Sequence, residues 1–196
     1  MSEALARAEP VSDQAYGGHG VTLSLAEPLA RYSLRARQAA VLDDLLGIQL
    51  PRQIGAIQDG VACLGPDEWL LRLPAGSVIV TGAGLPVAIT DISDRSVCLL
   101  AEGPRAAEVL AAGCPLDLDR FAVGRATRTV FESVEIILLR TGENRFEVEV
   151  WRSFAPWFRL ALETAARQLR LGGIWRIGPR TSIPEPMDSP TGAGAA

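Results

Sequence analysis

The stretch Phe146-Glu147-Val148-Glu149-Val150-Trp151 decides the fold, because its apolar side chains alternate with acidic ones up to the closing tryptophan. This period-two alternation is typical of a β-strand with one buried face. An apolar, β-branched run at 134–140 precedes it, and the intervening residues include the turn formers Gly142 and Asn144. We therefore predict an antiparallel hairpin over 134–151.

Three segments with capping residues at their ends predict helices, at 38–46, 104–112 and 154–171. Gly47 and Gly113 follow the first two, where glycine most often ends a helix. Pro104 suits the first position of the second helix. Ser153 can cap the third helix, which Gly172-Gly173 ends. The third helix has an apolar face made of Phe154, Trp157, Phe158, Ala161, Leu162, Ala165 and Leu169.

Further apolar runs predict strands at 31–37, 55–64, 68–73, 87–92, 97–102 and 128–132. The order strand, helix, strand, strand occurs twice, at a spacing of 66 to 68 residues. The predicted fold class is therefore α+β, with duplicated β-α-β-β lobes. We expect a flexible N-terminal segment at 1–20, a first lobe at 21–93, a second lobe with a C-terminal helix at 94–177, and a disordered tail at 178–196.

The longest stretch without charge, Leu73 to Thr90, approaches the length of a membrane span. Prolines and glycines interrupt it, so we predict a pair of short strands broken by turns. The first ten residues carry charges and no apolar region, which argues against a signal peptide. We expect no membrane association and a cytoplasmic location.

The composition excludes several classes of function. The chain has 196 residues, 48% of them hydrophobic, and a formal net charge of −4. This acidic balance argues against nucleic-acid binding. All basic residues are arginine, so lysine-based Schiff-base and P-loop chemistry are excluded. Three scattered cysteines and one histidine, His19, which lies in a glycine loop, offer neither zinc-ligand spacing nor a Cys/His pair.

The candidate sites are few. Thr81-Gly82-Ala83-Gly84 precedes another strand pattern and not a helix, so it predicts a turn and not a dinucleotide site. The acidic pairs of the chain lie in turns or on polar faces, and we expect them to be solvated. The polar junction from Asp91 to Arg95 is either a binding loop or an ordinary turn.

Large aromatic side chains and arginine are typical of interface anchors. The candidates for a partner interface are Trp69, Trp151, Arg152 and Trp157. Trp151 lies on the polar phase of its strand, next to Arg152. It therefore belongs to an exposed partner surface, to ordinary core packing or to a second covered face of the sheet.

Four segments of the chain resemble the gamma-subunit family of heterotetrameric sarcosine oxidase. They are Leu64 to Leu71 (LGPDEWLL), Thr90 to Arg95 (TDISDR), Gly103 to Leu118 (GPRAAEVLAAGCPLDL) and Phe146 to Ala155 (FEVEVWRSFA). The resemblance is good over about 64–167 and loose over 21–61. The wider superfamily is the aminomethyltransferase fold of the glycine cleavage T-protein, whose lobes are also duplicated; this chain would lack its third domain.

This resemblance implies a complex with alpha, beta and delta subunits that oxidatively demethylates sarcosine with O₂. The products are glycine, hydrogen peroxide and formaldehyde or 5,10-methylenetetrahydrofolate. FAD, FMN, NAD and tetrahydrofolate are implied for the complex, and none for this chain alone.

The chain departs from the T-protein pattern where that pattern carries a Gly-Gly-x-x-Asp-Asp run. The corresponding stretch, 133–138, contains one carboxylate, Glu135. We therefore carry over no catalytic, cofactor-binding or metal-binding residue and expect a non-catalytic structural subunit. The alternative is a stand-alone folate-binding protein, for which Glu135 or Asp91 would supply the carboxylate. A third hypothesis is an unrelated module that holds a metabolite at 91–95.

Overall fold

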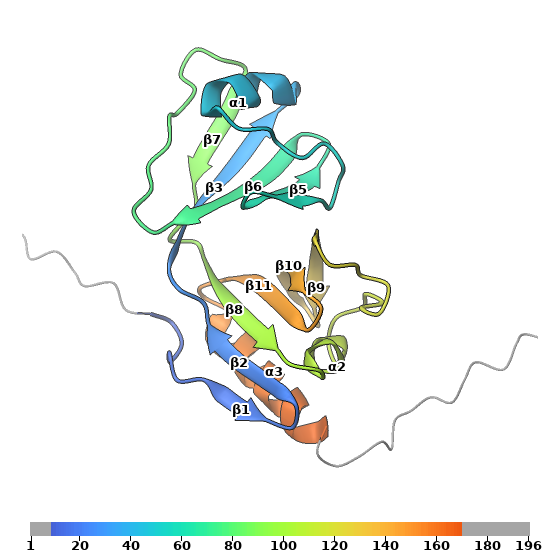
Figure 1. Cartoon of the computed structure of the whole chain (residues 1–196). Coiled ribbons are helices and arrows are strands. Elements are labelled where there is room, and N and C mark those ends of the chain that lie inside the picture. The colour runs from blue at the N-terminus through green and yellow to red at the C-terminus, as the bar shows by residue number, and fades with distance from the viewer. Residues whose placement is uncertain (1–8, 170–196) are drawn as a thin grey trace, which may run out of the picture.

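The computed structural model describes residues 9–169 and shows an α+β fold with two antiparallel sheets (Figure 1). Most of the predicted elements are present, and the boundaries of several shift by one to three residues. The elements in chain order are β1 (Tyr16–Gly18), β2 (Val21–Leu25), β3 (Leu29–Ala36), α1 (Ala39–Leu46), β4 (Ile57–Gln58), β5 (Val61–Gly65), β6 (Glu68–Pro74), β7 (Val87–Asp91), β8 (Ser96–Glu102), α2 (Ala106–Ala111), β9 (Arg125–Phe131), β10 (Val134–Gly142), β11 (Arg145–Trp151) and α3 (Ala155–Gln168).

The five-stranded sheet has the order β4-β5-β6-β3-β7, and the six-stranded sheet has the order β1-β2-β8-β11-β10-β9. The predicted hairpin of β10 and β11 is confirmed, with Ile136 opposite Val150 and Leu138 opposite Val148. A bulge between Arg140 and Gly142 closes it. Because β11 lies between β8 and β10, it is one of the two central strands of the larger sheet.

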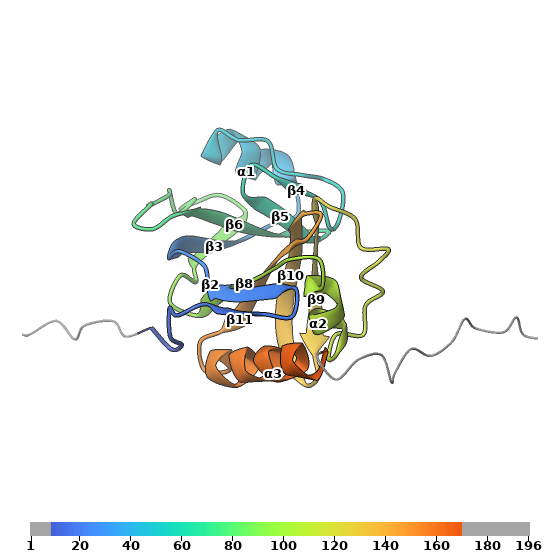
Figure 2. The same ribbon diagram turned by 60° about the horizontal axis from the view of Figure 1, so that its bottom comes forward.

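The molecule is built in layers, which Figure 2 shows from the side. Helix α1 covers the outer face of the five-stranded sheet, and α2 and α3 cover the outer face of the six-stranded sheet. The inner faces of the two sheets meet. A small apolar cluster fills part of this contact and consists of Ala62, Leu70, Ile92, Ala126 and Leu139. Successive side chains of a strand point to opposite faces of its sheet. A strand can therefore place alternate side chains in the core beneath the helices and in the contact between the two sheets.

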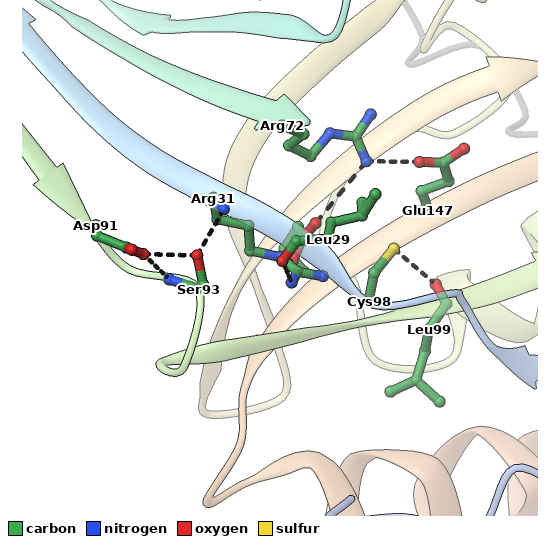
Figure 3. Close-up of polar contacts among 9 residues, drawn as sticks. Leu29, Arg31, Arg72, Asp91, Ser93, Cys98, Leu99 and Glu147 are labelled. Carbon is green, nitrogen blue, oxygen red and sulfur yellow. Dashed lines mark hydrogen bonds and ion pairs between the residues drawn. The ribbon is translucent and has the colours of Figure 1, made fainter. Parts of the chain in front are cut away.

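Strand β11 shows what covers its polar phase. Phe146, Val148 and Val150 are buried in the core beneath α2 and α3. Glu147 points to the other face, toward Arg72 of the five-stranded sheet (Figure 3). Glu149 forms a hydrogen bond with Arg31 of the same sheet. The sequence analysis left open whether the polar side of this strand is an exposed partner surface, part of a core or a second covered face of the sheet. At Glu147 and Glu149 it is a second covered face.

The helix ends differ from the prediction in two places. Ser153 does not cap α3: the N-cap is Phe154, without a side-chain cap hydrogen bond, and a proline lies in the first turn. Pro104 precedes α2 and is not its first residue, because the helix begins at Ala106. Gly113 is required for a different reason than a left-handed turn, since an added Cβ would lie 2.7 Å from the Phe131 ring.

The limits of the lobes also differ from the prediction. Strand β1 lies within 1–20, where no regular element was expected, and β2 pairs with β8 in the larger sheet, although residues 21–25 were assigned to the first lobe. The uncharged run 73–90 does not form the predicted pair of short strands. Its first two residues end β6, residues 75–86 form a loop, and the last four belong to β7. The strand-helix-strand-strand order is present twice, but β11 separates β10 from β8, whereas β6 pairs directly with β3. The proposed tail at 178–196 and Gly172-Gly173 lie outside the described residues.

Candidate functional site

The main polar cluster of the structure lies between the two sheets (Figure 3). We call its four residues the charged seam: Arg31 on β3, Arg72 on β6, and Glu147 and Glu149 on β11. Arg31 Nε donates to Glu149 Oε2 at 2.7 Å, and both side chains are at most 3% exposed. Arg72 Nη1 donates to Glu147 Oε2 at 2.5 Å. The seam therefore joins the two sheets by ion pairs between residues 75 and 118 positions apart.

A chain of hydrogen bonds connects the seam to the polar junction at 91–95. The backbone N–H of Arg31 donates to Ser93 Oγ at 2.9 Å, and the Ser93 hydroxyl donates to Asp91 Oδ1 at 2.5 Å. The Ser93 backbone N–H also donates to the same carboxylate oxygen at 2.9 Å. These hydrogen bonds hold the pKa of Asp91 below its usual range. Locally, the junction is thus a turn built on an aspartate.

The ionisation of Glu147 and of the neighbouring Cys98 does not favour catalysis. Burial raises the pKa of Glu147, but the hydrogen bond from Arg72 and the nearby guanidinium charges outweigh it, and the pKa ends below its ordinary value. Burial raises the pKa of the neighbouring Cys98 thiol far above its ordinary value. A carboxylate stabilised by ion pairs is a poor base, and a protonated buried thiol is a poor nucleophile. The arrangement fits a structural clamp.

The seam is not fully satisfied. Glu149 Oε1 lies 3.8 Å from Arg72 Nη1 and accepts no hydrogen bond from the described residues, and Arg72 Nε donates none there. At the same contact between the sheets, Arg128 on β9 donates to Glu68 on β6 at 2.6 Å. Because Arg31 and Glu149 are almost fully buried, their ion pair fixes how the two sheets meet more than it adds net stability.

Other candidates from the sequence lie apart from this cluster. Glu135 is half exposed and lies 3.9 Å from Arg128. Within residues 9–169, no group of three or more histidine, cysteine or acidic side chains could hold a metal ion. All three cysteines are buried as free thiols. No helix in the described part of the chain is long and apolar enough to cross a membrane.

The predicted interface residues are divided between core and surface. Trp69 is buried beneath α1, and its Nε1 donates to the Pro51 carbonyl at 2.8 Å, so it cannot contribute to a surface. Trp151 and Trp157 are exposed. Arg152 is partly exposed and forms an ion pair with Glu9 at 3.3 Å.

The exposed tryptophans belong to a larger apolar patch on β11 and the first turns of α3. We call it the aromatic surface: Trp151, Phe154, Trp157 and Leu160, each between 39% and 57% exposed. The rings of Trp151 and Phe154 lie 6.4 Å apart. Trp157 meets the buried Phe131 edge-on at 6.4 Å, which holds its ring in place.

Arg95 borders the aromatic surface, with its guanidinium 5.7 Å from the centre of the Trp151 ring. The sequence analysis named Arg95 in the candidate loop 91–95 and placed Phe154 on the apolar face of the third helix, but it assigned neither of them, nor Leu160, to the interface. The spacing of positions 154, 157 and 160 could have indicated the exposed apolar face, because it places three apolar side chains on one side of α3. The buried face of the same helix includes Phe158 and Leu162. A helix with apolar side chains on two faces has more apolar surface than its own domain covers.

Comparison with known proteins gives a family match over most of the described chain. The family described as "Sarcosine oxidase, gamma subunit family" matches residues 33–168. The chain is 36% identical over 121 residues to a sarcosine oxidase subunit gamma from Arthrobacter sp., a match that covers 56% of this chain and 60% of that protein. A subunit gamma from Corynebacterium sp. (strain U-96) is 35% identical over 127 residues, with 59% and 62% covered. The matches thus span about three fifths of the length of these relatives.

Two solved structures share the fold. A chain of the heterotetrameric sarcosine oxidase from Corynebacterium sp. U-96, in complex with pyrrole 2-carboxylate, superposes with a TM-score of 0.73 at 29% identity, covering 83% of this chain and 91% of that one. The glycine cleavage system aminomethyltransferase T from Bartonella henselae gives a TM-score of 0.55 at 18% identity, covering 76% and 49%. The second likeness concerns the fold alone.

Proposed function

Because the chain belongs to the sarcosine oxidase gamma-subunit family, we propose that it is a non-catalytic structural subunit of a heterotetrameric sarcosine oxidase. The complex would contain alpha, beta and delta subunits and oxidise sarcosine with O₂ to glycine and hydrogen peroxide. The one-carbon unit would leave as formaldehyde or as 5,10-methylenetetrahydrofolate. This chain would contribute a docking surface and no reacting group.

The observation that carries this proposal is the aromatic surface. This surface exposes four neighbouring apolar side chains: Trp151, Phe154, Trp157 and Leu160. Exposed apolar patches of this kind commonly mark contacts with a partner protein. Arg95 at its border adds the residue type that most often accompanies tryptophan in binding hot spots. We assign Trp151, Trp157 and Arg152 to the interface and remove Trp69.

The cofactors of such a complex would be held by its other subunits. FAD, FMN and NAD need a site for a pyrophosphate or phosphate group, and a helix N-terminus after a glycine turn commonly supplies it. The described part of the chain has two Gly-x-Gly turns, Gly18-His19-Gly20 and Gly82-Ala83-Gly84, and they lead into strands β2 and β7 and not into a helix. The residues present therefore do not fit a dinucleotide.

Co-expression with the other three subunits tests the proposal. A tag on this chain should recover a flavin-coloured complex that releases peroxide when sarcosine is added. The double variant Trp151→Ser with Leu160→Asp should lose the partners and keep the far-ultraviolet circular dichroism of the wild type, because both residues are exposed. The matched control Val123→Asp changes an equally exposed residue in the loop between α2 and β9 and should assemble normally.

Two results would contradict the proposal. One is a wild-type chain that purifies alone from the co-expressing cells. The other is a double variant that assembles as well as the Val123→Asp control. A lone chain that binds tetrahydrofolate would favour the alternative, a stand-alone folate-binding protein.

A further inference from the structure

The loop 75–86 lies beside the open edge of the five-stranded sheet. Strand β7 ends the sheet order and pairs, within the described residues, with β3 alone. In Figure 1 the loop rises from the end of β6 and runs along the outer side of β7 before entering it. An open strand edge carries unpaired N–H and C=O groups, which can accept another strand.

The sequence of this loop conflicts with its structure. Residues Ser77-Val78-Ile79-Val80-Thr81 contain four β-branched side chains in a row and no charge, a composition that favours strands. They nevertheless form no strand, and Val78 is 89% exposed. Such a conflict between local preference and observed structure is expected where a protein binds something.

A groove separates the loop from the sheet. It has a volume of about 430 Å³, and its lining includes Ala30 and Tyr32 of β3, Ile89 of β7 and Ile79 of the loop. The Tyr32 hydroxyl donates to the Ser77 carbonyl at 2.6 Å and thereby ties the loop to β3. The groove is therefore lined on one side by residues of the edge strand β7 and its neighbour β3, and on the other by a strand-forming segment.

The charges along the groove have one sign. Its lining contains two carboxylates, Asp91 and Asp94, and no arginine. Asp91 has no ion-pair partner among residues 9–169, and the hydrogen bonds from Ser93 favour its ionised form. A ligand that fills the groove would be complementary if it carried a positive charge at the Asp91 end and small apolar side chains along the rest.

We propose that this groove binds an extended segment of a partner subunit, which adds as a strand to the edge of β7 and places a basic side chain at Asp91. The mode is strand addition, in which backbone hydrogen bonds give affinity and alternate side chains enter the groove. The proposal rests on the proposed function in one respect, since the partner is taken to be another subunit of the same oxidase. It adds a second contact, on the opposite lobe from the aromatic surface.

Hydrogen exchange of the full chain, alone and in the co-expressed complex, tests the proposal directly. Amides at 77–81 and 87–91 should exchange at least about tenfold more slowly in the complex, because the added strand protects them. Peptides from α3 serve as the internal reference for assembly through the aromatic surface. Protection of α3 with unchanged exchange at 77–81 and 87–91 would overturn this inference and leave the proposed function intact.

Two pairs of variants give a second measurement. Val78→Glu should weaken assembly about tenfold or more, whereas Leu85→Glu, an exposed residue of the same loop outside the groove lining, should not. Asp91→Asn should weaken the affinity of assembly about threefold, which corresponds to the loss of one exposed ion pair. Asp119→Asn, on another exposed loop, should leave the affinity unchanged. Equal affinities within both pairs would refute the proposal.

The remaining outcomes also decide the question. If no complex forms with the wild-type chain, both the inference and the proposed function are wrong. If the isolated chain protects 77–81 at high concentration and has the mass of a dimer, the groove binds a second copy and the partner assignment is wrong. If tetrahydrofolate alone protects the same residues, the groove is a small-molecule site.

Discussion

Removing Arg31 tests whether the charged seam behaves as a buried ion pair. Arg31→Met keeps the length of the side chain and leaves the Glu149 carboxylate buried without its 2.7 Å partner. Breaking one partner of such a pair costs roughly 3–5 kcal/mol. The lost hydrogen bond to the Leu29 carbonyl adds about 1 kcal/mol, and Arg72, 3.8 Å away, offsets part of the loss. We expect a net destabilisation of about 4 kcal/mol.

Urea unfolding of the full chain measures this change. With a slope near 2 kcal/mol per molar urea, the transition midpoint should fall by about 2 M. The double variant Arg31→Met with Glu149→Leu removes both charges and should recover most of the lost stability, since an apolar pair of similar volume can replace a buried ion pair.

A control on the same strand makes the test specific. Arg35 lies four positions further along β3, is about half exposed, and pairs with Glu68 at 3.0 Å. Arg35→Met should therefore cost less than about 1 kcal/mol. The reasoning is refuted if Arg31→Met costs no more than Arg35→Met, or if the double variant is as unstable as the sum of its single variants.

Three further outcomes follow from the structure. Gly113→Ala should destabilise the chain by about 1–3 kcal/mol, because its methyl group would meet the Phe131 ring at 2.7 Å; an unchanged melting temperature would contradict this. Cys98 should react with thiol reagents only after unfolding, since burial raises its pKa; labelling of the native chain, followed by mass spectrometry, checks this. The pKa of Glu147 is lowered on folding, so its stabilisation is present above its ordinary value near 4.3 and is lost as the pH falls through the folded value. Urea midpoints between pH 5 and pH 3 should thus fall more steeply for the wild type than for Glu147→Gln, and parallel curves would argue against the Arg72 pair.

The alternation in Phe146 to Trp151 was sufficient to predict a strand, and the apolar patterns of 134–140 and 154–171 predicted its hairpin partner and the helix that covers it. This worked because side-chain period and turn residues act over a few positions. The same local signals placed Gly47 correctly after α1, where it has a positive φ of 66°. Ser153 failed as a cap because α3 starts one residue later, with Phe154 at the N-cap and a proline in its first turn.

The interface candidates show where local reasoning ends. Trp69 and Trp151 both lie on strands beside charged residues, and the sequence does not separate them. In the structure, Trp69 is buried under α1, whereas Trp151, the last residue of β11, is 43% exposed. Exposure depends on which element covers a side chain, and the covering elements come from distant parts of the chain.

The sequence by itself determined the α+β class, the positions of most strands and helices and the absence of lysine chemistry. Only the tertiary structure decided the order of strands in each sheet and the pairing of β2 with β8. It also decided that the polar side chains of β11 are covered by the other sheet. Those glutamates look solvent-facing in the sequence, but Arg31 and Arg72 cover them from another sheet. The physical reason is that strand periodicity is set by neighbouring residues, whereas burial of a charge is set by partners that folding brings from 75 or more positions away.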